Sequence, residues 1–480
     1  MSFISFHFLA IVLCLFFLYY ILPPKFQPYL LILGNVYFYY RNSGKMLFLL
    51  IITSFVCYLC GSLLQSLDKN AFSRRRAVLF FSVLLMLSPL FFLKYSGFTL
   101  NLLGIDFTHS FLIPMGISFY TLQLIGYLAD IYRQELKAEK NFLRFFLFTS
   151  FFPQILQGPI PRYGALSETL FGKHDFNEEN ISYGLQKILW GLFFKFMIAS
   201  KAAVFVDPIF NSQETVAGSL YLIAGILYSF QLYADFLSCV YLSQGIALLF
   251  GVKLSENFAQ PYFATSIKDF WRRWHISLSL WLRDYVYIPL GGNRKGTVRT
   301  GFNLLFTFFV SGLWHGAGMK YIFWGLMHGF YQIIGKYTLS LRNRLYTLLK
   351  PLSRVRPVLQ KITTFFLVMT AWIIFRADSL ALGLHALHSI VFDFRPSAFF
   401  QESLFLKRQN DSEFALLLLF IFFLLLWDFL NEDKKDVIKE TLQKSVGVRI
   451  AYSVFLLLII AVFGTYGYGY DAATFIYGGF

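Results

Sequence analysis

Long apolar segments separated by short polar or basic stretches run along the whole chain. A helix needs about 20 apolar residues to cross a bilayer, so the longer segments predict transmembrane helices. The shorter ones must be tilted, paired or re-entrant. The segments lie near residues 3–22, 28–40, 46–67, 77–94, 110–129, 143–157, 183–206, 217–236, 239–251, 301–314, 319–336, 362–376, 413–431 and 450–468. The pattern predicts an all-α polytopic membrane protein with about 11 transmembrane helices plus re-entrant and interfacial helices.

Basic clusters between these segments predict the orientation of the chain. They lie at residues 68–76, 132–144, 268–299, 336–357 and 431–449. Because Lys and Arg are enriched in cytoplasmic loops, we expect all of them inside and both termini outside. The first apolar segment has neither a basic start nor a small-residue cleavage site, which indicates a retained helix. No composition break or fixed repeat appears, so we expect one integral membrane domain over residues 1–480.

Composition supports a membrane protein and changes the meaning of the charge. The chain is 57% hydrophobic and 14% charged, whereas a soluble domain is roughly a quarter charged. A net charge of +16 would suggest nucleic acid for a soluble protein. Here the charges lie in loops between apolar segments, so we expect a lipid bilayer as partner and no nucleic acid. The CxxC of Cys57 and Cys60 lacks basic neighbours and a metal partner, and we expect two buried thiols.

The stretch "VSGLWHGAGMKYIFWGLMHG", residues 310–329, places two histidines in an apolar setting. Basic clusters on both sides predict a hairpin that leaves the cytoplasm and returns, with "WHGAG" at its turn. Non-helical backbone at that depth must line a cavity in the protein or water. Gly316 and Gly318 would permit the turn and the close approach of a ligand.

His315, at the predicted turn, is the first candidate for chemistry. An imidazole titrates near pH 6.5, so it can take a proton from a hydroxyl group at neutral pH as a general base. The alternative is a histidine hydrogen-bonded between helices. His328 lies 13 residues further on, beside Gly329, and we expect it to serve helix packing.

The stretch from residue 266 to 296 predicts a second functional element. As one continuous helix it would carry a cationic face with His275 and an aromatic face, which is typical of an interfacial helix. The cationic face is either a membrane anchor or a site that grips the phosphates of a cytoplasmic donor. The donor-binding candidates are Lys268, Arg272, Arg273, Arg283, Arg294 and Lys295.

Two further stretches carry polar groups within apolar surroundings. "FFPQILQGPIPRY", residues 151–163, has three prolines, which predict a broken helix or a re-entrant loop. Gln154 and Gln157 either line a polar tunnel there or flank a proline-terminated helix end. Asp235 is costly in a membrane unless paired, and we expect an arginine or histidine partner. We find no G-x-S-x-G, Walker or H-E-x-x-H motif, and we expect no metal.

Taken together, these stretches resemble the membrane-bound O-acyltransferase (MBOAT) family. The similarity is greatest to the bacterial branch that serves alginate, peptidoglycan and other cell-surface O-acetylation. The matching stretches occur in family order within a core of residues 111–330. They are 111–133, 151–163, 231–236, 257–296 and 311–329. "YIPLGGNRKG" favours the polysaccharide-acetylating branch over the branch that D-alanylates teichoic acid.

The resemblance implies a ring of helices around a central funnel and tunnel, where a cytoplasmic thioester meets an acceptor hydroxyl. It maps the family's catalytic histidine onto His315 and its second functional histidine onto His275. Many relatives carry a second aspartate six residues after Asp235, where this chain has Tyr241. The remaining tunnel or structural candidates in these motifs are Trp314, Gly316 and Asn257.

The C-terminal "TFIYGGF" is similar to a short aromatic tail of this branch, in which a tyrosine is implicated as an acyl relay. Tyr477 would be that tyrosine, and the alternative is an interfacial aromatic residue.

The expected function is transfer of an acyl group, in the simplest case acetyl, from a thioester donor to a hydroxyl acceptor. The donor would be acetyl-coenzyme A or an acylated carrier protein, with no permanently bound cofactor. The resemblance also implies a bacterial cytoplasmic (inner) membrane location and an extracytoplasmic SGNH-type partner that passes the acyl group to a polysaccharide. The alternatives are D-alanylation of teichoic acid, a transporter or flippase, and a scaffold. Broken helices suit a transporter, but the pseudo-repeat that a transporter predicts is not seen.

Overall fold

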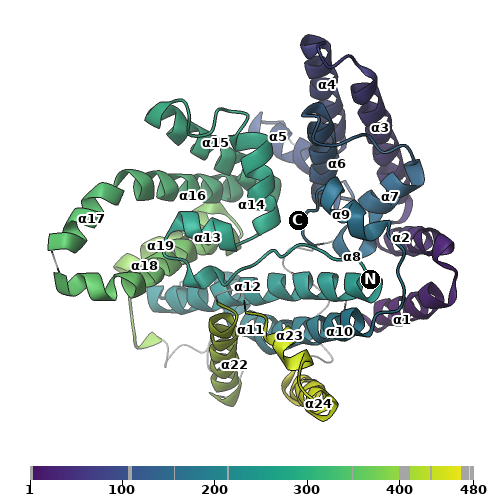
Figure 1. Cartoon of the computed structure of the whole chain (residues 1–480). Coiled ribbons are helices and arrows are strands. Elements are labelled where there is room, and N and C mark those ends of the chain that lie inside the picture. Colours follow the sequence, from purple (N-terminus) through teal and green to yellow (C-terminus); the bar gives the residue numbers. More distant parts are fainter. Residues whose placement is uncertain are drawn as a thin grey trace. The chain divides into compact units, whose positions relative to one another are not determined.

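The computed structural model describes residues 4–105, 111–155, 157–212, 216–348, 350–398, 411–432, 435–465 and 475. Within these residues the regular elements are helices, and the only β-type pairing is an isolated bridge between Phe258 and Trp274. The all-α prediction is therefore confirmed (Figure 1).

Seven helical spans in the described part of the chain are long and apolar enough to cross a membrane. They are Pro24–Ser66, Phe72–Leu102, Glu178–Phe210, Gly218–Leu249, Val355–Arg376, Ser412–Leu430 and Val446–Phe463. Helices Phe6–Ile21 and Leu380–Phe392 are apolar but shorter. The protein is thus a multi-pass membrane protein, while the count of about 11 crossings stays a prediction.

Residue contacts divide the chain into two compact units. The first consists of residues 1–191, 239–256 and 473–479, and the second of 192–238, 257–472 and 480. The expectation of a single domain over the whole chain stays a prediction.

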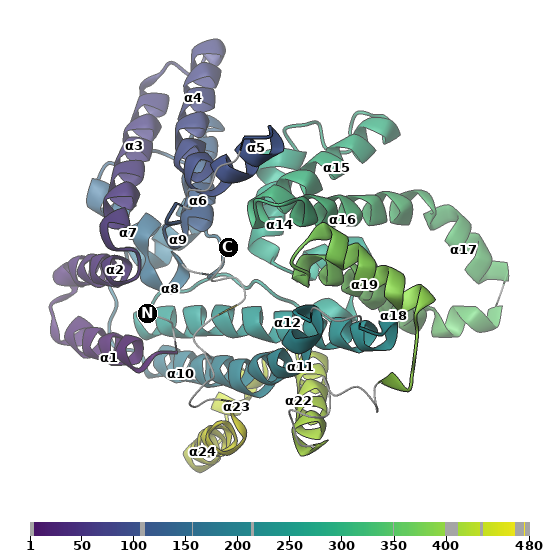
Figure 2. The same ribbon diagram turned by 180° about the vertical axis from the view of Figure 1, so that it is seen from behind.

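The first unit holds the N-terminal helices. They are α1 (Phe6–Ile21), α2 (Gln27–Ser43), α3 (Leu47–Ser66), α4 (Phe72–Leu90), α5 (Ser96–Leu102), α6 (Ile117–Tyr132), α7 (Phe142–Ser150), α8 (Phe152–Ile155), α9 (Tyr163–Leu170) and most of α10 (Glu178–Phe193). α3 and α4 lie side by side in both views (Figures 1 and 2). The short α8 after α7 confirms the broken helix that the prolines predict.

Arg75 shows that one predicted loop charge has an internal role. Its side chain is 4% exposed and donates hydrogen bonds to the carbonyl oxygens of Leu64, Ile131 and Tyr132. These carbonyls lie at the C-terminal ends of α3 and α6, where helices leave acceptors without intrahelical partners. Arg75 therefore joins two helix ends, a use that positive-inside reasoning does not reveal.

The second unit holds the remaining helices. They are α11 (Ser200–Phe210), the first part of α12 (Gly218–Leu249), α13 (Ile267–Arg273), α14 (Ile276–Leu282), α15 (Gly296–His315), α16 (Met319–Tyr337), α17 (Leu339–Leu348), α18 (Lys350–Arg376), α19 (Leu380–Phe392), α22 (Asp411–Leu430), α23 (Val437–Leu442) and α24 (Val446–Phe463). π-helical turns interrupt the helices at Phe194–Ala199 and Arg283–Tyr287.

α15 and α16 form the predicted hairpin, and glycines bring the two helices together. Figure 2 shows them as neighbouring helices. A Cβ atom on Gly325 would overlap the carbonyl oxygen of Phe308, and one on Gly312 would overlap that of Tyr321. Only glycine permits this backbone approach, which is typical of packing between membrane helices. The predicted segments 301–314 and 319–336 match the observed helices closely.

The helices differ from the predicted segments in three places. The segments 217–236 and 239–251 form one helix of 32 residues, α12, because the intervening Leu237 and Ser238 do not interrupt the helix. The basic stretch 336–357, which was predicted only to be cytoplasmic, is largely helical, as α17 and the start of α18. α19, at residues 380–392, was not among the predicted segments.

Candidate active site

His315 is the last residue of α15, at the turn of the hairpin. It is 2% exposed, and aromatic rings surround its imidazole. The ring centroids of Trp314 and Trp324 each lie 4.8 Å from that of His315, and the centroid of Phe375 lies 5.5 Å away. The imidazole therefore occupies a buried, aromatic environment at a break between two helices.

Gly316 makes the hairpin turn possible by steric necessity. Its φ is −177°, which is ordinary extended backbone, so conformational freedom does not explain the glycine. A Cβ atom at this position would overlap the ring of Tyr321 on α16. At Gly318 the same ring would lie 3.7 Å away, an ordinary contact. The room that Gly316 provides is filled by Tyr321, and the predicted approach of a ligand stays a prediction.

The predicted continuous helix over residues 266–296 was wrong. α13 ends at Arg273, Trp274 is extended, and His275 takes the left-handed conformation with φ of 44° before α14 begins. For a residue with a Cβ atom, the left-handed conformation costs about 1–2 kcal/mol of conformational free energy. Neighbouring structure must therefore hold His275 in place.

The segment that holds His275 is the strand-like stretch around Asn257. The Ala259 N–H donates to the Arg273 carbonyl at 2.9 Å, and the Ile276 N–H donates to the Asn257 carbonyl at 3.0 Å. The Asn257 side-chain oxygen also accepts from the Ser277 N–H at 3.0 Å. Because these partners lie far apart in the sequence, helical periodicity in 266–296 cannot anticipate the break.

His275 is fully buried, so it does not lie on a cationic surface as predicted. Phe236 packs edge-on against its imidazole at 4.8 Å, and Trp314 does so at 5.8 Å. Neither ring nitrogen has a hydrogen-bond partner among the described residues. Burial lowers the pKa of His275 to about 3. His275 is therefore a neutral imidazole at physiological pH.

Trp314 brings the two predicted histidines into one cluster. Its ring contacts His315 on α15 and His275 at the start of α14, which are 40 residues apart in the sequence. His328 is fully buried too, and its Nδ1 accepts a hydrogen bond from Trp271 Nε1 at 3.3 Å. That internal hydrogen bond agrees with the packing role expected for His328.

Asp235 is paired with a lysine and not with the expected arginine or histidine. Lys195 Nζ lies 2.8 Å from Asp235 Oδ1, and the two side chains are 5% and 2% exposed. Lys195 belongs to the π-helical turn at Phe194–Ala199, and such turns often occur at functional sites. Phe236, the next residue after Asp235, contacts His275. The apolar segment 183–206 carries three lysines, Lys187, Lys195 and Lys201, and these buried charges were the signal that sequence reasoning missed.

The six donor-binding candidates fall into two groups. Arg273 lies 3.2 Å from Asp269, and Arg283 lies 2.7 Å from Asp284, so both arginines have neighbouring carboxylates. The others are exposed, and the described residues include no ion pair to them. They are Lys268, Arg272, Arg294 and Lys295. These four charges remain available for an anionic ligand.

The glutamines of the proline-rich stretch lie in the first unit and make internal contacts. Both are buried. Gln154 Nε2 donates to the Phe148 carbonyl at 3.2 Å, and Gln157 Oε1 accepts from Cys239 Sγ at 2.6 Å. These contacts agree with a structural role, and lining of a tunnel stays a prediction.

Tyr241 takes part in a second buried lysine site, also in the first unit. Lys187 Nζ lies 5.0 Å from the centroid of the Tyr241 ring, 2.7 Å from Gln244 Oε1 and 2.9 Å from Glu256 Oε1. Where the resemblance leads one to expect a carboxylate, an aromatic face therefore contacts the lysine and Glu256 supplies the negative charge. Tyr477 lies outside the described residues, and its proposed relay role stays a prediction.

Comparison with known proteins shows relatives over most of the chain. The profile of "MBOAT, membrane-bound O-acyltransferase family" matches residues 36–377. A probable alginate O-acetylase of Pseudomonas syringae pv. tomato is 35% identical over 76% of this chain and 70% of its own length. A peptidoglycan O-acetyltransferase of Helicobacter pylori is 34% identical over 77% of this chain and 74% of its own.

A teichoic acid D-alanyltransferase of Bacillus subtilis is also similar, at 30% identity over 56% of this chain and 69% of its own length. The family match contains His275 and the α15–α16 hairpin with His315. The chain therefore belongs to the membrane-bound O-acyltransferase family and is an O-acyltransferase.

Proposed function

We propose that this protein transfers an acetyl group from a cytoplasmic thioester to a hydroxyl acceptor, for O-acetylation of a cell-surface or secreted polysaccharide. The observation that carries the proposal is the burial of His315 in an aromatic cage that it shares, through Trp314, with His275. The alginate and peptidoglycan relatives are 34–41% identical to this chain, against 29–30% for the D-alanyltransferases. This difference favours acetyl over D-alanyl as the acyl group.

In the proposed reaction His315 acts as general base. The imidazole accepts the proton of the acceptor hydroxyl while the hydroxyl oxygen attacks the thioester carbonyl carbon. The tetrahedral intermediate collapses, the C–S bond breaks, and the thiolate leaves with the proton that His315 carried. The products are an ester and a thiol, and no net proton is consumed. The aromatic walls exclude water, which favours transfer over hydrolysis of the thioester.

His275 supports this reaction as a neutral hydrogen-bond donor. An imidazole with a pKa of about 3 carries one N–H at neutral pH. That N–H would stabilise the oxygen of the tetrahedral intermediate, as donors in oxyanion holes do. Removal of one such donor lowers kcat by about 100–1000-fold in well-studied enzymes.

The exposed charges Lys268, Arg272, Arg294 and Lys295 would bind the phosphates of the donor, acetyl-coenzyme A or an acylated carrier protein. In this scheme the protein lies in the bacterial cytoplasmic membrane with these residues inside. Tyr477 accepts the acetyl group and relays it to an extracytoplasmic SGNH-type partner. That partner then passes the acetyl group to the glycan. No permanently bound cofactor takes part.

The similarity to a teichoic acid D-alanyltransferase supports a second candidate function, transfer of D-alanine from a carrier protein. One experiment separates the two. The gene is expressed in a strain from which its chromosomal copy is deleted, and esters are released from the isolated envelope and secreted glycans with mild base. Recovery of acetate that depends on the gene supports O-acetylation, and recovery of D-alanine in place of acetate contradicts it.

A further inference from the structure

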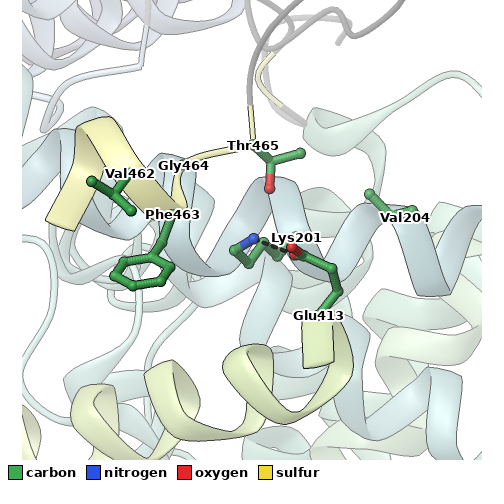
Figure 3. Close-up of a pocket in the computed structure, with 7 residues that line it drawn as sticks. All are labelled: Lys201, Val204, Glu413, Val462, Phe463, Gly464 and Thr465. Atoms are coloured by element: carbon green, nitrogen blue, oxygen red, sulfur yellow. Dashed lines mark hydrogen bonds and ion pairs between the residues drawn. The ribbon is translucent and has the colours of Figure 1, made fainter. Parts of the chain in front are cut away.

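A cavity of about 260 Å³ lies in the second unit, away from the histidine cluster. It is lined by Lys201 and Val204 of α11, Glu413 of α22, Val462 and Phe463 of α24, and the following Gly464 and Thr465 (Figure 3). α24 ends at Phe463 and α22 begins at Asp411, so the cavity lies where two apolar spans end. In a bilayer that level is the headgroup region.

An ion pair forms the polar wall of this cavity. Lys201 Nζ lies 2.5 Å from Glu413 Oε2, and the two side chains are 4% and 44% exposed. A buried lysine in an apolar span is costly and marks a functional site by default. An ammonium group has three donors, and the described residues take up one of them. Figure 3 shows the hydroxyl of Thr465 facing the pair.

Val204, Val462 and Phe463 supply the apolar part of the lining, and Gly464 and Thr465 complete it. Val462 on α24 is 69% exposed, and most of the other large apolar side chains of that helix are exposed too. The cavity is therefore lined in part by a residue of the exposed surface of α24. The volume of 260 Å³ lies below the 300–1,000 Å³ of pockets that hold drug-sized ligands. It suits the polar head of a lipid with its chains outside.

We propose that this cavity binds a zwitterionic phospholipid headgroup with a primary ammonium, the chemistry of phosphatidylethanolamine. Phosphate oxygens accept from the unused donors of Lys201, and the lipid ammonium donates to the half-exposed carboxylate of Glu413. Because the Lys201–Glu413 pair is neutral overall, a bound zwitterion leaves the site without net charge. An anionic lipid or free phosphate would add a net charge.

The test is native mass spectrometry of the full-length protein, reconstituted with equal amounts of phosphatidylethanolamine, phosphatidylcholine and phosphatidylglycerol. We expect about tenfold more bound phosphatidylethanolamine than phosphatidylcholine, which lacks an N–H donor, corresponding to about 1.4 kcal/mol. Glu413→Gln should remove this preference, and Lys201→Met should reduce binding of all three lipids. The matched control is Lys361→Met, which removes a lysine from a pair with Glu432 at 4.0 Å beyond the other end of α22.

If Lys201→Met does not insert into the membrane, Glu413→Gln and the cavity-filling Val204→Phe carry the test, because both retain the buried lysine. Equal binding of phosphatidylethanolamine and phosphatidylcholine by the wild type would overturn the proposal. Equal loss in the Lys361→Met control would do so as well. Release of the bound lipid by millimolar inorganic phosphate would identify a phosphate site and overturn the lipid assignment.

Discussion

The Lys195–Asp235 pair gives a prediction whose magnitude follows from its burial. Both side chains are nearly inaccessible, and their charged atoms lie 2.8 Å apart within apolar spans. Removal of one partner leaves an uncompensated buried charge, which costs about 3–5 kcal/mol. Replacement of both partners by apolar residues of similar volume is often close to neutral. We therefore expect Lys195→Met and Asp235→Leu each to destabilise strongly, and the double variant to lie within about 1 kcal/mol of wild type.

The assay is denaturant unfolding of the purified protein in detergent micelles, followed by tryptophan fluorescence. Arg395→Ala is the control, since it removes an exposed pair with Asp393 in which the side chains are 51% and 48% exposed. Such a pair contributes about 0–1 kcal/mol. If the double variant loses as much stability as the two single variants added together, the reasoning about mutual compensation is refuted. An active double variant would further show that the pair serves structure and not chemistry.

Three other predictions concern the turn of the hairpin, the helix break at His275 and binding of the donor. Gly316→Ala should abolish acyl transfer, because its Cβ atom would overlap the Tyr321 ring, whereas Gly318→Ala should retain activity; transfer assays on the two purified variants compare them directly. Burial lowers the pKa of His275 from about 6.5 to about 3, so the unfolded state binds a proton that the folded state does not. Stability should therefore fall by about 1.4 kcal/mol per pH unit as the pH drops from 6.5 toward 3, and His275→Gln should show a shallower fall in thermal melts; parallel curves would contradict this. Arg272→Ala should raise KM for acetyl-coenzyme A several-fold with kcat unchanged and weaken the salt dependence of KM; a change in kcat alone would exclude a role in donor binding.

The hydrophobic pattern was sufficient for elements whose partners are close in sequence. The α15–α16 hairpin was predicted within a few residues, because two apolar segments flanked by basic clusters admit few arrangements. The position of His315 at its turn followed directly. The same pattern did not predict the correct length of α12, because a polar residue inside a long buried helix resembles the end of an apolar segment.

Features that depend on distant partners were not predictable from local pattern. The break at His275 arises because residues 257–259 take up backbone groups that a continuous helix would have used internally. The pairing of Asp235 with Lys195 joins two helices whose register the sequence does not show. Arg75, assigned to a loop by its charge, is buried because three carbonyl groups of other segments accept from it.

The measurement that tests the account most directly is single-turnover acyl transfer by purified His315→Ala protein, with radiolabelled acetyl-coenzyme A and a soluble hydroxyl acceptor. His388→Ala, at an exposed histidine on α19, is the matched control. The account predicts that donor binding persists in both variants, while ester formation falls by at least about 100-fold in His315→Ala alone, the range expected for loss of a general base. Ester formation at the wild-type rate by a correctly inserted His315→Ala protein would contradict the assignment of His315 as the base.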